Sequence, residues 1–145
     1  MNSFNHYSYG AIGDWMYRVV AGLDHDSAAP GYRHVMIHPQ PGGGLTFAKA
    51  TLMTPYGEAS SGWSLDGDRL TVTATVPPNT RATIRLPGAR LSDVREGDRA
   101  LATSLGIARP AQVGDDVVAE LGSGRYVFAY MAPELAARAR ATPGR

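Results

Sequence analysis

The sequence predicts a mainly β protein, an antiparallel β-sandwich of about eight strands preceded by one N-terminal α-helix. Three observations lead to this prediction. From about Arg33 onward, apolar and polar residues alternate in short runs, as they do in strands that bury one face. Turn sequences rich in Gly, Pro, Asn and Asp separate these runs. Before Asp26, in contrast, the apolar residues recur every three or four positions, which is the period of a helix.

Composition limits the classes of function. The chain has 145 residues, which is the size of one domain, and a formal net charge of +1. Its arginines are scattered, so we expect neither nucleic acid nor a membrane surface as a partner. It has no cysteine, which excludes disulfides and thiolate metal sites. No signal peptide is recognisable at the N-terminus, so the chain as written is expected to be cytoplasmic.

The N-terminal helix is predicted over residues 9–23. Its apolar stripe consists of Ile12, Trp15, Met16, Val19, Val20 and Leu23. An isolated helix of this length is marginally stable in water, so the stripe needs a packing partner. The rest of the chain predicts no second helix of comparable length. We therefore expect the chain to begin in the middle of a larger protein.

The strand region begins after Pro30-Gly31. Residues 70–76 give the clearest pattern, because Leu, Val and Ala alternate there with three threonines. The predicted strands are residues 33–37, 45–53, 58–65, 70–76, 81–86, 89–94, 117–121 and 125–130. Residues 102–112 fit no pattern well. From Pro133 onward we expect a frayed tail with at most one helical turn.

Candidate catalytic carboxylates are isolated from one another. A glycosidase needs two carboxyl groups across a cleft. Asp14 fits a first-turn position on the helix, Asp24 and Asp26 fit the loop that ends it, and Glu58 fits an exposed strand end. Nothing in their spacing pairs them, so the sequence predicts no catalytic residue.

The histidines predict no metal centre. His34 and His38 share one face of a predicted strand, but no third ligand has a suitable spacing, and we expect neither a metal nor a cofactor. His6 is different, because it stands in Asn5-His6-Tyr7 ahead of an apolar helix. Aromatic and short polar side chains together are typical of a sugar-binding wall.

Several segments resemble the C-terminal part of the bacterial α-L-rhamnosidases. They are residues 3–15, 17–22, 30–32, 37–45, 55–57, Trp63 and 76–80. The resemblance implies a large inverting glycosidase that removes terminal α-L-rhamnose from glycosides and polysaccharides. It also implies that residues 1–26 are the last helix of a catalytic α/α barrel, 27–32 a linker, 33–132 a C-terminal β-sandwich and 133–145 a tail.

The same resemblance implies a role for two residues and the absence of two others. His6, with Asn5, would bind the substrate, a rhamnosyl glycoside or polysaccharide. Both catalytic glutamates of the family lie upstream of the segment that resembles residues 3–9. The chain alone is therefore expected to be inactive, with the remainder of the barrel as its partner.

Two alternatives remain open at this stage. The chain could be a carbohydrate-binding sandwich that uses Tyr56 and Trp63 as stacking platforms. It could instead be a structural partner that docks its helix onto a separately encoded barrel.

Overall fold

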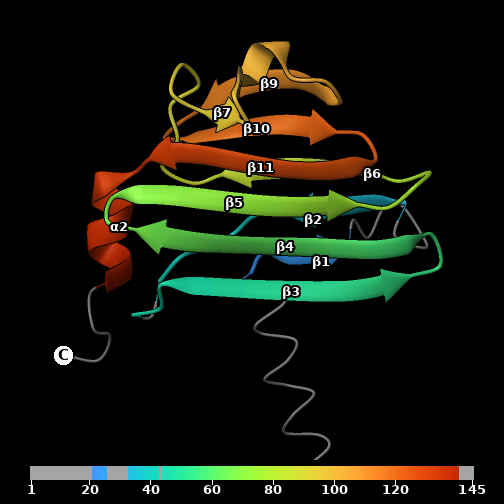
Figure 1. The fold of residues 1–145 in the computed structure, drawn as a ribbon, viewed down its shortest axis with the longest axis horizontal. Coiled ribbons are helices and arrows are strands. Elements are labelled where there is room, and N and C mark those ends of the chain that lie inside the picture. Colours follow the sequence, from blue (N-terminus) through green and yellow to red (C-terminus); the bar gives the residue numbers. More distant parts are fainter. Residues whose placement is uncertain (1–20, 26–32, 43, 141–145) are drawn as a thin grey trace, which may run out of the picture.

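The computed structural model describes residues 21–25, 33–42 and 44–140, and these form two facing β-sheets with a short helix at one end (Figure 1). Figure 1 shows β3, β4, β5 and β11 side by side in the front layer, with β1, β2 and β6 behind them. The predicted β-sandwich is confirmed.

The rear sheet has five strands in the order β1-β2-β6-β10-β9. These are β1 (Leu23–His25), β2 (His34–Ile37), β6 (Arg81–Leu86), β10 (Asp116–Leu121) and β9 (Ile107–Val113). All neighbours are antiparallel except β2 and β6, which run parallel. We call this sheet A.

The front sheet, sheet B, has six strands in the order β3-β4-β5-β11-β7-β8. These are β3 (Phe47–Thr54), β4 (Gly57–Asp66), β5 (Arg69–Val76), β11 (Gly124–Met131), β7 (Arg95–Glu96) and β8 (Arg99–Ala100). All of its pairs are antiparallel. The 3₁₀ turn η3 (Leu101–Thr103) follows β8, and the helix α2 (Pro133–Arg140) follows β11.

The core lies between the sheets and follows the alternation that the sequence predicts. On β5, every second residue from Leu70 to Val76 is buried, and the intervening threonines are half-exposed. Phe128 of β11 and Ile84 of β6 are fully buried. Full burial of one such side chain stabilises the fold by about 1.5–3 kcal/mol.

Seven of the eight predicted strands are present, and the prediction for residues 89–94 is wrong. That segment is a loop, because the side chain of Gln112 forms hydrogen bonds with the backbone of Ala89 and Leu91. A backbone hydrogen bond from Asp93 to Arg90 closes a turn within it. Strand β9 occupies most of the region that fitted no pattern.

Both ends of the described chain differ from expectation. Leu23, predicted as the last helical residue, is the first residue of β1 and pairs with Ile37. Residues 133–140 form α2, because Ala136 and Ala139 are buried and fix that helix. The division of the chain at residues 26 and 32 stays a prediction. No helix within the described ranges is long and apolar enough to cross a bilayer.

Candidate functional site

The predicted substrate-binding residues, Asn5 and His6, lie outside the described residues, as do Asp14 and Asp26. Among the other carboxylates that the sequence analysis considered, Glu58 is exposed at the start of β4 of sheet B. Asp24 is half-buried in β1 of sheet A. The two features of the described residues that follow, a chain attachment and a groove, are built from other residues.

The first of these features lies at Ala21 and Gly22, just before β1. The hydroxyl of Ser61 on β4 donates a hydrogen bond to the carbonyl oxygen of Ala21. The backbone N–H of His38, just after β2, donates to the next carbonyl oxygen, that of Gly22, at 2.7 Å. Two consecutive peptide carbonyls are thus bonded to different sheets. We call Ala21, Gly22, His38 and Ser61 the joint.

The joint has no room for a side chain at residue 22. Gly22 has a φ angle of +76°, which glycine adopts without the steric cost that other residues incur. A Cβ atom there would lie 2.1 Å from both the carbonyl carbon and the oxygen of His38, and 2.3 Å from the nitrogen of Pro39. Since these are backbone atoms, no side-chain rotation relieves the clash.

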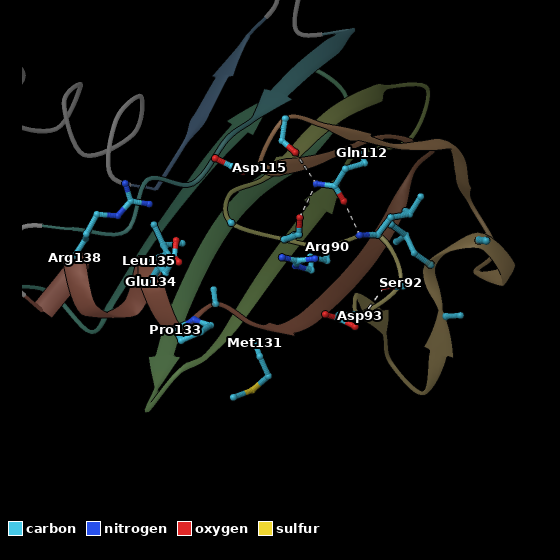
Figure 2. Close-up of a pocket in the computed structure, with 18 residues that line it drawn as sticks. Arg90, Ser92, Asp93, Gln112, Asp115, Met131, Pro133, Glu134, Leu135 and Arg138 are labelled. Atoms are coloured by element: carbon cyan, nitrogen blue, oxygen red, sulfur yellow. Dashed lines mark hydrogen bonds between the residues drawn. The ribbon is translucent and has the colours of Figure 1, made fainter.

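A groove of about 1050 Å³ lies at the end of the sandwich beside α2 (Figure 2). Figure 2 shows Gln112 beside the loop that carries Arg90, while Glu134, Leu135 and Arg138 line the opposite side from α2. The side chains that line the groove carry both charges, and Leu91 and Leu135 add apolar surface.

Gln112 holds the loop side of this groove together. Its amide nitrogen donates to the carbonyl oxygens of Ala89 at 2.9 Å, Gly114 at 3.1 Å and Asp116 at 2.9 Å. Its amide oxygen accepts from the N–H of Leu91 at 2.9 Å. The amide nitrogen therefore bonds only to backbone carbonyls, while the amide oxygen accepts one of the two hydrogen bonds that it can accept.

Asp116 and Tyr130 fix the segment that leads into the same loop. One carboxylate oxygen of Asp116 accepts from Nε of Arg85 at 2.7 Å, and the other accepts from the N–H of Gly88 at 3.1 Å. The hydroxyl of Tyr130 donates to the carbonyl oxygen of Pro87 at 2.7 Å. Burial, with a smaller effect of the charge of Asp116, raises the pKa of Tyr130 well above its usual value.

A second pocket, of about 350 Å³, is lined by His38 and shares Leu135 and Arg138 with the groove. Burial lowers the pKa of His38, because the charged imidazole loses solvation. The negative charge of Asp116 opposes this shift and the positive charge of Arg85 adds to it. His34, the other histidine expected on the same strand face, has Nε2 2.8 Å from the hydroxyl oxygen of Thr83.

The proposed stacking role of Trp63 is wrong. Trp63 is only 3% exposed and belongs to the core between the sheets, so no sugar ring can reach its face. Tyr56 is half-buried in the turn between β3 and β4. The most exposed aromatic side chain among the described strands is that of Phe47 on β3, at 69%.

The chemistry available in the groove is limited. Asp93, Asp115 and Glu134 are exposed to solvent, whereas a glycosidase acid sits in apolar surroundings that keep it protonated. In the described ranges, no three His, Asp or Glu side chains converge in a way that could hold a metal ion. What the structure does show at the joint and on the loop side of the groove are hydrogen bonds that hold chain segments in place.

Comparisons with known proteins identify what this sandwich resembles. Over 87 residues the chain is 49% identical to an α-L-rhamnosidase of Formosa agariphila and 46% identical to one of Streptomyces avermitilis. Each alignment covers 60% of this chain, but only 9% and 8% of those proteins. These alignments therefore span less than a tenth of the length of these curated relatives.

Solved structures give the same result over more of the chain. The Streptomyces avermitilis α-L-rhamnosidase complexed with L-rhamnose matches with a TM-score of 0.71 and 36% identity, covering 89% of this chain and 12% of that one. The α-L-rhamnosidase from Dictyoglumus thermophilum matches with a TM-score of 0.71 and 29% identity, covering 85% and 14%. The family model of the bacterial alpha-L-rhamnosidase C-terminal domain matches residues 22–100, which is more than half of the 145. The chain belongs to the bacterial α-L-rhamnosidase C-terminal domain family.

Proposed function

We propose that this chain is the C-terminal portion of an α-L-rhamnosidase that removes terminal α-L-rhamnosyl residues from glycosides or polysaccharides. The match to the Streptomyces avermitilis enzyme is the main support, since 89% of this chain aligns at 36% identity with only 12% of that enzyme. The sandwich then serves as an accessory domain beside a catalytic barrel, and the remainder of that barrel is its partner.

In this proposal the chain alone does not hydrolyse rhamnosides. Inverting hydrolysis needs an acid and a base roughly 6.5–9.5 Å apart, on opposite sides of the bond that is cleaved. Of the candidate carboxylates within the described ranges, Asp24 lies on sheet A and Glu58 on sheet B. The carboxylates that line the groove are exposed to solvent. Asn5 and His6 would contribute contacts to the rhamnose, while both catalytic glutamates would come from the rest of the enzyme.

A chimera tests the accessory role. The segment of the Streptomyces avermitilis enzyme that matches this chain is replaced by residues 1–145, and hydrolysis of an aryl α-L-rhamnoside is measured. We expect the chimera to retain activity that a deletion of the same segment loses. A chimera with Trp63→Ala, which removes the largest side chain of the core cluster, serves as the control and should behave like the deletion. If the unmodified chimera is no more active or soluble than the deletion, the proposal fails.

A further inference from the structure

The joint holds the chain at one point from both sheets, and we propose that Ser61 and Gly22 are positioning residues for the N-terminal segment that precedes Ala21. The functional consequence rests on the proposed function, in which that segment carries Asn5 and His6 into the rhamnose pocket. The proposal itself concerns only how firmly the sandwich holds the start of that segment.

The surroundings of Ser61 indicate what its hydroxyl does. Ser61 is fully buried, and its neighbours across the sheet are Ala50 on β3 and Ala74 on β5. An alanine would pack in this place as well as its neighbours do. The hydroxyl is a buried polar group that costs free energy unless it is bonded, and its partner is the carbonyl oxygen of Ala21. Its role is therefore to hold residue 21.

Gly22 provides the second half of the attachment. Its missing side chain lets its backbone approach the His38–Pro39 peptide directly, and the N–H of His38 bonds its carbonyl oxygen. Pro39 is fully buried, so this peptide is itself fixed in the core. Because Ala21 is bonded to Ser61 of sheet B and Gly22 to His38, the residue that follows β2 of sheet A, a shift of residues 21 and 22 breaks at least one bond. Positional accuracy of this kind matters in enzymes, where a misplacement of about 1 Å can cost roughly 100-fold in rate.

The absence of cysteine makes a direct test possible. An Arg18→Cys variant of the full chain carries one nitroxide label, three residues before Ala21, and its mobility is read by electron paramagnetic resonance. Ser61→Ala and Gly22→Ala are each added to it. Ser64→Ala is the matched control, because Ser64 is an exposed serine on the same strand. Leu101→Ala is the second control, because it removes a buried side chain next to β9, the strand of sheet A farthest from β1.

Spectra are compared at a temperature at which circular dichroism shows every variant folded. We expect Ser61→Ala and Gly22→Ala to shift the label toward the mobile line shape, and both controls to leave it unchanged. A label whose mobility is the same in all variants would overturn the proposal. So would an equal shift in Leu101→Ala, since the effect would then be general loosening. The readout involves no hydrolysis, so its failure is distinguishable from an inactive chimera.

Discussion

The hydroxyl of Tyr130 and the carbonyl oxygen of Pro87 form a 2.7 Å hydrogen bond that connects β11 of sheet B to the end of β6 of sheet A. Tyr130 is 3% exposed, so water cannot replace the bond. The two residues are 43 positions apart in the chain, and the bond between them joins the two layers beside α2.

Removing this hydroxyl should destabilise the fold. Tyr130→Phe leaves the carbonyl of Pro87 without its donor, and the cost of an unpaired buried group is about 1–3 kcal/mol. Urea unfolding measures this loss. Tyr56→Phe is the control, since Tyr56 is only half-buried, and it should change the free energy of unfolding by less than about 0.5 kcal/mol. Equal effects of the two changes would contradict the assigned role of Tyr130.

Trp63 should act on stability and not on sugar binding. Trp63→Ala empties a large volume in the core, and we expect a loss of about 3–5 kcal/mol. Phe47→Ala, at a side chain that is 69% exposed, should leave the free energy of unfolding nearly unchanged. Thermal or urea unfolding distinguishes the two. A Trp63→Ala chain of undiminished stability that has lost affinity for rhamnosyl glycans would restore the stacking-platform interpretation.

Gln112 should protect the loop at residues 88–93 from proteolysis. Gln112→Ala removes the side-chain bonds from Gln112 to Ala89 and Leu91 of this loop, so the loop should open more often. Trypsin cleaves after Arg90, which is exposed in the loop, and the rate at this site should rise. Cleavage after Arg69 on β5 provides an internal reference in the same digest. An unchanged ratio of the two rates would show that Gln112 does not hold the loop.

The lowered pKa of His38 predicts a pH dependence of stability. The unfolded chain binds a proton near pH 6.5, before the folded chain does, so stability is complete above about pH 6.5 and falls as the pH drops toward the folded pKa. His38→Gln keeps the backbone donor to Gly22 and removes the imidazole, so its stability should fall less between pH 7.5 and pH 5. Urea unfolding at these two pH values measures the difference. Identical losses in both chains would contradict this assignment.

The strands were predictable wherever burial alternates strictly. Residues 69–76 and 81–86 have one face in the core and one outside, so their sequences carry the period of two directly. Residues 89–94 also alternate, but Ala89 and Val94 are buried in a loop. The shape of this loop depends on Gln112, which bonds Leu91 across 21 positions and Ala89 across 23. A long-range side-chain bond of this kind leaves no local pattern.

The joint was only partly visible in the sequence. Gly22 falls within the predicted helix of residues 9–23, and its close contact with His38 is non-local, so no local pattern reveals it. Ser61 did carry a signal, because it falls between Ala59 and Trp63 on the apolar face of a strand. A polar residue in that place needs a specific partner. The sequence could not identify Ala21 as that partner.

Hydrolysis by the purified 145-residue chain tests the central claim most directly. The chain is incubated with an aryl α-L-rhamnoside, and release of the aryl group is followed against buffer alone. We predict no release above buffer, because an inverting mechanism needs an acid and a base that the proposal assigns to the rest of the enzyme. Turnover that survives repurification and is abolished by Asp14→Asn or Glu58→Gln would contradict the account.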